Sequence, residues 1–156
     1  MLVDSREQKW DHVKDWCDQK NISYKIKKLD NCDYSFYLPA APELNIEREL
    51  RFDKEIAIER KASLDELAGN LTEHRTRFEE EMATFKGKKY LLVENATYDK
   101  IVNEKYRSQY KANSYLATLH AFNHRYNLEI VLMPDNKHSG LWIYSTFMYW
   151  LREKLR

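Results

Sequence analysis

The stretch Ile58-Glu59-Arg60-Lys61-Ala62-Ser63-Leu64-Asp65 decides how this sequence is interpreted. Glu59 and Lys61 are two positions apart on a predicted strand, so both side chains emerge on one face and Arg60 points to the other. A carboxylate beside an ammonium group suits phosphodiester hydrolysis, because the carboxylate can hold a divalent cation and the lysine can orient water or offset charge on the phosphate. Glutamate and lysine also alternate on many solvated strands, so the pair needs support from the rest of the chain.

The apolar periodicity on both sides of this stretch predicts alternating strands and helices. Ser63 and Glu66 have the spacing of a capping box, which predicts a helix that runs to about residue 71. Residues 44–52 alternate with a period near two and are predicted to form an exposed hairpin arm. Further strands are predicted at 2–4, 24–28, 34–38, 55–59, 90–94 and 128–133, and further helices at 8–20, 73–85, 99–103, 115–126 and 141–155. This order predicts an α/β fold in which helices flank a central mixed β-sheet.

Length and composition bound the class of protein. A chain of 156 residues, 43% of them apolar, predicts one domain over residues 1–156 with one hydrophobic core. The formal net charge is +1, so affinity for a polyanion has to come from local clusters of lysine and arginine. Cys17 and Cys32 are too few for a disulfide framework, which predicts a reduced, cytoplasmic chain. The N-terminus lacks the apolar core of a signal peptide, and no segment reaches the roughly 20 apolar residues of a membrane span, so no membrane partner is expected.

Three motifs in a fixed order support the interpretation of Glu59 and Lys61. Val3-Asp4-Ser5-Arg6-Glu7, then Asp33-Tyr34-Ser35-Phe36, then the stretch from Ile58 to Leu67 resemble the DxRE, GDY and ERKxxxD motifs of the XPF-type nuclease family. The resemblance continues through Arg75-Thr76-Arg77-Phe78 and Tyr90-Leu91-Leu92-Val93-Glu94, so it covers nearly the whole chain. It implies a single restriction-endonuclease-like PD-(D/E)xK domain. It also implies a metal-dependent endonuclease that hydrolyses phosphodiester bonds in DNA, with branched or flap DNA from repair, recombination or replication as the expected substrate.

The resemblance also implies roles for individual residues. The metal carboxylates fall on Asp33 and Glu59, the backbone carbonyl of Arg60 is a further ligand, and Lys61 takes the role of the catalytic lysine. Asp4 falls on the first acidic position, near the metal. An all-oxygen ligand set of this kind implies Mg²⁺ or Mn²⁺.

Outside this centre, Asp65 falls on the acidic position after the lysine and Arg6 on the arginine of the first motif, and both are expected to support catalysis. Phosphate contacts are expected from four cations on the segments that follow, namely Arg75, Arg77, Arg107 and Lys111. Arg60, whose side chain faces away from Glu59, is expected to be structural.

The sequence departs from the family pattern at two places. Cys32 stands where the family usually has glycine, and cysteine would be strained if that position requires a positive φ, so a different local turn is expected. Asp33 and Glu59 are 26 positions apart, which predicts that residues 40–52 extend the connecting hairpin. The chain also ends without the tandem helix-hairpin-helix domain of the eukaryotic and archaeal enzymes. It therefore resembles the small standalone nucleases of phages and bacteria, and a phage-encoded form would act in the bacterial host cytoplasm.

Several alternatives stay open at this point. One is a non-catalytic DNA-binding or scaffold module with a nuclease fold, and another is a different PD-(D/E)xK activity such as sequence-specific restriction. His120 and His124 have metal-ligand spacing on a helix, but no third zinc ligand is apparent, so solvated or packing histidines are the favoured interpretation. The last helix is apolar over more than one face, which favours a homodimer.

Overall fold

The computed structural model describes residues 1–156. The chain forms two compact units, one made of Met1–Ile58 with Lys137–Arg156 and the other of Glu59–Asn136. Strand β6 (Ile56–Lys61) passes from the first unit into the second. The six-stranded sheet has the order β2-β1-β3-β6-β7-β8, which confirms the predicted α/β fold with a mixed sheet. The prediction of a single domain stays a prediction.

The first unit carries the N-terminal strands and two helices that pack together. Its elements are β1 (Leu2–Asp4), α1 (Asp11–Gln19), β2 (Lys25–Lys27), β3 (Tyr34–Ser35) and α6 (Ser139–Lys154). Strand β1 runs parallel to β2 and antiparallel to β3, and all three residues of β1 are buried. Trp16 of α1 lies 5.7 Å from the ring of Tyr144 on α6. Strand β1, which carries Asp4, is therefore held between β2 and β3.

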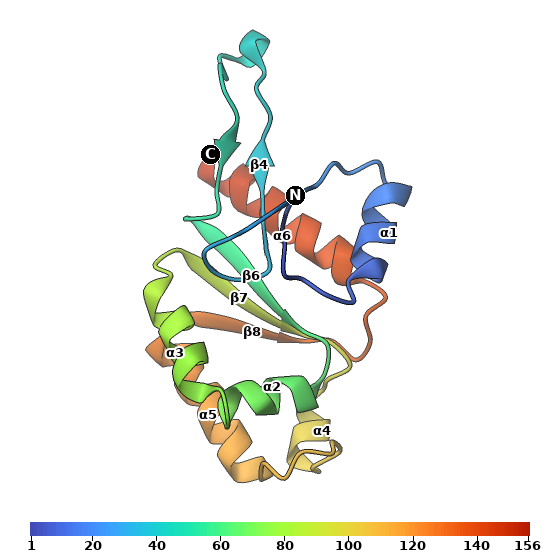
Figure 1. Ribbon diagram of the computed structural model, residues 1–156, viewed down its shortest axis with the longest axis vertical. Coiled ribbons are helices and arrows are strands. Elements are labelled where there is room, and N and C mark those ends of the chain that lie inside the picture. Colours follow the sequence, from blue (N-terminus) through green and yellow to red (C-terminus); the bar gives the residue numbers. More distant parts are fainter. The chain divides into compact units, whose positions relative to one another are not determined.

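The predicted hairpin arm is confirmed and projects from the first unit (Figure 1). It consists of β4 (Tyr37–Leu38), the 3₁₀ turn η1 (Pro42–Leu44) and β5 (Leu50–Arg51), and β4 pairs with β5 in antiparallel register. At its base, the rings of Phe36 and Phe52 stack 4.5 Å apart, and both meet Trp150 of α6. Aromatic packing therefore fixes the base of the arm, while Leu44 near its tip is 68% exposed.

The second unit places its helices against two parallel strands. These strands are β7 (Lys88–Val93) and β8 (Leu128–Leu132), and the helices are α2 (Leu64–Leu71), α3 (Arg75–Thr84), α4 (Tyr98–Val102) and α5 (Ala112–Arg125). Helices α2, α3 and α5 lie on one side of β7 and β8 (Figure 1). Phe78 of α3 and Phe122 of α5 are buried and stacked between these helices, with ring centroids 6.3 Å apart.

The structure corrects three local predictions. The apolar run 34–38 is split between β3 and β4, because the Ser35 hydroxyl bonds the carbonyl of Ile56 and the chain then leaves the main sheet. The first helix begins at Asp11 and not at residue 8, since Lys9 has a φ of 53°. Cys32 has a φ of 64°, so the turn keeps the backbone conformation that glycine favours, and the expected change of turn is wrong. No helix is long and apolar enough to span a membrane.

Candidate active site

Glu59 and Lys61 form a buried ion pair on strand β6. Lys61 Nζ lies 3.1 Å from Glu59 Oε1, and the two side chains are 9% and 10% exposed. The pair confirms that residues two apart on this strand share a face. Lys61 Nζ also lies 5.8 Å from the ring centroid of Phe78, which is buried on α3. A carboxylate and an ammonium group are thus held together where little water screens them.

Arg60 points away from this pair, as predicted, and makes an ion pair of its own. Its Nη1 lies 2.6 Å from Oε1 of Glu94, and the two side chains are 3% and 1% exposed. The Glu94 backbone amide donates to the carbonyl of Lys61 at 2.8 Å, so the same residue also fixes the strand end. The side chain of Arg60 is therefore structural, and Glu94 is a supporting residue that the sequence alone did not single out.

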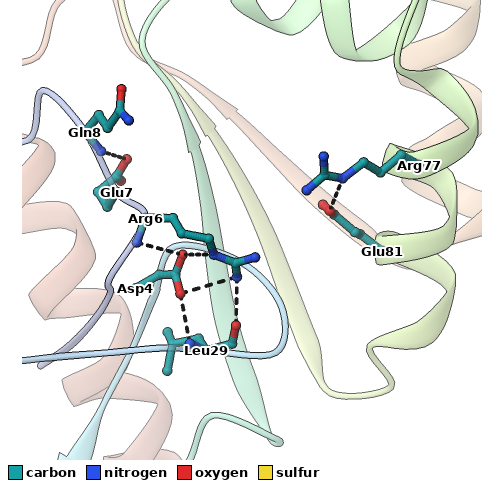
Figure 2. Close-up of polar contacts among 7 residues, drawn as sticks. All are labelled: Asp4, Arg6, Glu7, Gln8, Leu29, Arg77 and Glu81. Atoms are coloured by element: carbon teal, nitrogen blue, oxygen red, sulfur yellow. Dashed lines mark hydrogen bonds and ion pairs between the residues drawn. The ribbon is translucent and has the colours of Figure 1, made fainter.

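Asp4 and Arg6 form a clamp at the end of β1 (Figure 2). Asp4 is 4% exposed, and its carboxylate accepts hydrogen bonds from Arg6 Nε at 2.9 Å and from the Leu29 amide at 2.8 Å. Arg6 Nη2 in turn donates to the Leu29 carbonyl at 2.9 Å. The two motif residues therefore lie together, and they hold the chain around Leu29, just before the turn that carries Cys32 and Asp33.

Asp33 is tied by its backbone to strands β1 and β6. Its amide donates to the Ile58 carbonyl at 2.9 Å, and its carbonyl accepts from the Asp4 amide at 2.8 Å. Ile58 immediately precedes Glu59 in the chain. Backbone hydrogen bonds of Asp33 therefore join the second motif to the first motif at Asp4 and to the third motif at Ile58.

Asp65 lies in the first turn of α2 and binds a loop that is distant in the sequence. Its Oδ1 accepts hydrogen bonds from the backbone amides of Arg107 at 2.9 Å and Ser108 at 2.7 Å. Ser63 caps the same helix by accepting from the Glu66 amide at 3.1 Å, which confirms the predicted helix start. No pattern in the sequence predicts that Asp65 contacts residues 107 and 108.

The cations predicted to contact phosphate differ in how they are engaged. Arg75 Nε bonds Glu79 at 3.2 Å, and the same carboxylate also accepts from Arg125 and Tyr126. Hydrogen bonds from Tyr126, then Arg75 and Arg125, hold the pKa of Glu79 below its ordinary value. Glu79 therefore restrains Arg75. Of the four predicted cations, Arg75 is the least available to a phosphate.

The other predicted cations are more exposed. Arg77 is paired with Glu81 at 3.3 Å (Figure 2), but its side chain is 78% exposed. Lys111 is 75% exposed and lies 3.9 Å from Glu104. Arg107 is exposed and makes no ion pair. Arg77, Arg107 and Lys111 are thus available to a polyanion, since exposed ion pairs of this length hold side chains weakly.

The two histidines with metal-ligand spacing do not form a metal site. His120 Nε2 lies 2.9 Å from the hydroxyl of Tyr98, and no group of three or more His, Cys, Asp or Glu side chains is arranged to hold a metal ion. The zinc alternative gains no support. Both His120 and His124 are exposed, which agrees with the preference for solvated or packing histidines.

Comparisons with known proteins bear on the fold and the family. The ERCC4 domain family matches residues 3–146. Among solved structures, XPF from Aeropyrum pernix is similar with a TM-score of 0.69, and XPF from Aeropyrum pernix in complex with DNA with a TM-score of 0.68, each at 22% identity. These alignments cover 99% of this chain but only 63% and 65% of the two solved chains. No curated protein matches. Because the family match spans well over half of the sequence, the chain belongs to the ERCC4 domain family, the nuclease-domain family that its motifs resemble.

Proposed function

We propose that this chain is a divalent-metal-dependent endonuclease that cuts DNA at a centre formed by Asp33, Glu59 and Lys61. The buried pair of Glu59 and Lys61, 3.1 Å apart on β6, carries the proposal. It lies within the motif order of a nuclease-domain family, and a similar structure was solved in complex with DNA. Branched or flap DNA is the proposed substrate class.

The donor set fits a hard divalent cation. Asp33 and Glu59 offer carboxylate oxygens and Arg60 offers a backbone carbonyl, which are ligands that Mg²⁺ and Mn²⁺ accept. Mg²⁺ is commonly held by only one or two carboxylates, with water and substrate phosphate completing its shell. A bound divalent cation would offset negative charge on the phosphate and activate the attacking water. In this proposal Asp4 lies near the metal, while its carboxylate mainly holds Arg6 and Leu29.

Lys61 is placed to act on the phosphate or the attacking water. Its side chain is 10% exposed, so its charge is only weakly screened by solvent. Glu59 on one side and the ring of Phe78 on the other restrict where Nζ can lie. A lysine held in this way can donate to an incoming oxygen without first being ordered, which is the origin of electrostatic preorganisation.

A homodimer is proposed on the basis of helix α6. Three apolar side chains on this helix are exposed, Leu141 to 46%, Met148 to 41% and Tyr149 to 52%. Apolar area of this kind is often covered by a partner. Sedimentation equilibrium of the wild type and of Tyr149→Glu tests this, since a dimer through α6 would shift to monomer in the variant.

The function is tested by cleavage of labelled fork, flap, junction and linear DNA with Mg²⁺, with Mn²⁺ and with EDTA. We expect metal-dependent cutting by the wild type and a loss of at least about 100-fold for Glu59→Gln or Lys61→Met, the range found when a preorganised catalytic group is removed. Glu80→Gln and Lys86→Met are the matched controls, because both residues are exposed and lie outside the centre. Unchanged cutting by Glu59→Gln would refute the site.

The assay also separates the alternatives. A wild-type chain that binds these DNAs and cuts none of them in either metal is a binding or scaffold module. A cut position that follows the base sequence on linear DNA, and not the position of the junction, indicates restriction-type activity.

A further inference from the structure

We propose that residues 104–111 form a DNA-backbone contact surface, and that Asp65 is the positioning residue that fixes this surface relative to Glu59 and Lys61. The inference rests on the proposed function and adds a role for the last motif residue that differs from metal binding or proton transfer. Every contact that carries it lies within the unit of residues 59–136.

The carboxylate of Asp65 binds the loop by two short contacts. Oδ1 accepts from the amides of both Arg107 and Ser108, at 2.9 and 2.7 Å. The preceding residue, Leu64, accepts from the hydroxyl of Tyr115 at 2.7 Å. Two consecutive residues of α2 thus bind the segment that contains the loop and the start of α5. Since α2 follows β6 directly, Asp65 lies only four residues after Lys61 and links the loop to the catalytic strand.

The loop is ordered by its own side chains as well. The Tyr106 hydroxyl donates to the Tyr110 carbonyl at 2.6 Å, and the Tyr110 amide donates to Ser108 Oγ at 3.1 Å. The rings of Tyr106 and Tyr110 lie 5.4 and 5.1 Å from the buried ring of Tyr115. The hydroxyl of Tyr110 is also 2.6 Å from that of Thr118. The loop contains no helix or strand, but these side-chain contacts restrict its conformation.

This ordered loop presents cations to solvent. Lys105, Arg107 and Lys111 are exposed, and of these three side chains only that of Lys111 makes an ion pair, with Glu104 at 3.9 Å. By contrast, Arg75 and Arg125 are engaged by Glu79. Cations on a preorganised loop lose less conformational freedom on binding, and three of them within seven residues suit successive phosphates of a nucleic acid. A DNA backbone is the polyanion that the proposed function supplies.

The substitution Asp65→Asn distinguishes positioning from chemistry. An amide oxygen can accept the same two hydrogen bonds, but it is a weaker metal ligand than a carboxylate and cannot act as a general base. We expect Asp65→Asn to keep slow amide exchange at Arg107 and Ser108, and to bind duplex DNA in EDTA as well as the wild type or better. Asp65→Ala should exchange faster at both amides and bind DNA about tenfold more weakly, because two charge-assisted hydrogen bonds are lost. The matched control is Asp99→Ala, which removes an exposed acid on α4.

The cations are tested by the salt dependence of the same binding. Lys105→Ala and Arg107→Ala should each lower the slope of log Kd against log salt by about one, and neither should change the amide exchange of the loop. Circular dichroism first establishes that each variant is folded. If Asp65→Ala is not folded, Asp65→Asn and the two cation variants still decide the matter.

Three results would overturn the inference. They are unchanged exchange and binding in a folded Asp65→Ala, unchanged salt slopes in both cation variants, and loss of metal-dependent cleavage by Asp65→Asn with normal DNA binding. Binding in EDTA and amide exchange do not depend on cleavage. A wild-type chain that binds DNA through this loop and cuts nothing would therefore refute the proposed nuclease activity alone.

Discussion

Removing one partner of the buried Arg60–Glu94 pair should destabilise the fold strongly, whereas replacing both should not. Their atoms lie 2.6 Å apart with side chains 3% and 1% exposed, so Glu94→Leu removes a carboxylate that contacts the buried guanidinium. Breaking a buried ion pair by removing one partner costs about 3–5 kcal/mol. At roughly 2–4 °C per kcal/mol for a domain of this size, the melting temperature should fall by roughly 6–20 °C.

The assay is urea denaturation, followed by circular dichroism, of wild type, Arg60→Met, Glu94→Leu and the double variant. The double variant should recover most of the stability lost in either single one, since two packed apolar side chains of similar volume often replace a buried ion pair without loss. Glu81→Leu is the control, because it breaks the exposed pair with Arg77 and should change little. A single-variant cost below about 1 kcal/mol, or a double variant as unstable as the sum of the two, would refute the reasoning.

The remaining predictions concern packing and pH. Gly140→Ala should lower the free energy of unfolding by about 1–3 kcal/mol, because the added Cβ would lie 2.8 Å from Cβ of Trp16. Gly69→Ala, a matched change in α2 with no atom within 4 Å, should instead raise it by about 0.5–1 kcal/mol. Hydrogen bonds, first from Tyr126, hold the pKa of Glu79 below its ordinary value of 4.5, so this carboxyl stabilises the fold above that pH and ceases to do so as the pH falls below it. The stability difference between wild type and Glu79→Gln, measured by urea denaturation, should therefore be present at pH 7 and shrink below pH 4.5. A difference that grows as the pH falls would contradict this sign.

Local patterns predicted the parts of the site that depend on neighbours in the chain. Strand alternation placed Glu59 and Lys61 on one face and Arg60 on the other, and both ion pairs confirm it. The capping box at Ser63 predicted the start of α2, because a cap is formed within a few residues of its helix. The order of the three motifs predicted the family, because residue identity and spacing can be read directly from the sequence.

Features that depend on distant partners could not be predicted in this way. Asp65 binds amides 42 and 43 residues further along the chain, a contact that no local pattern indicates. Arg75 and Glu79 are four residues apart on α3, but the ion pair of the same carboxylate with Arg125 of α5 has no local signal. The run 34–38 alternates like one strand, but the contact of Ser35 with Ile56 ends it early. Each of these contacts joins residues that are far apart in the sequence.

The proposed nuclease centre requires that Asp33 and Glu59 hold one divalent ion beside Lys61. A crystal structure of the chain grown with Mn²⁺ tests it most directly, because the anomalous signal of manganese locates the ion without reference to any expected site. We expect one strong peak coordinated by a carboxylate oxygen from each of Asp33 and Glu59, and its loss in crystals of Glu59→Gln. A peak bound by other residues, or none at a Mn²⁺ concentration that supports cleavage, would contradict the claim.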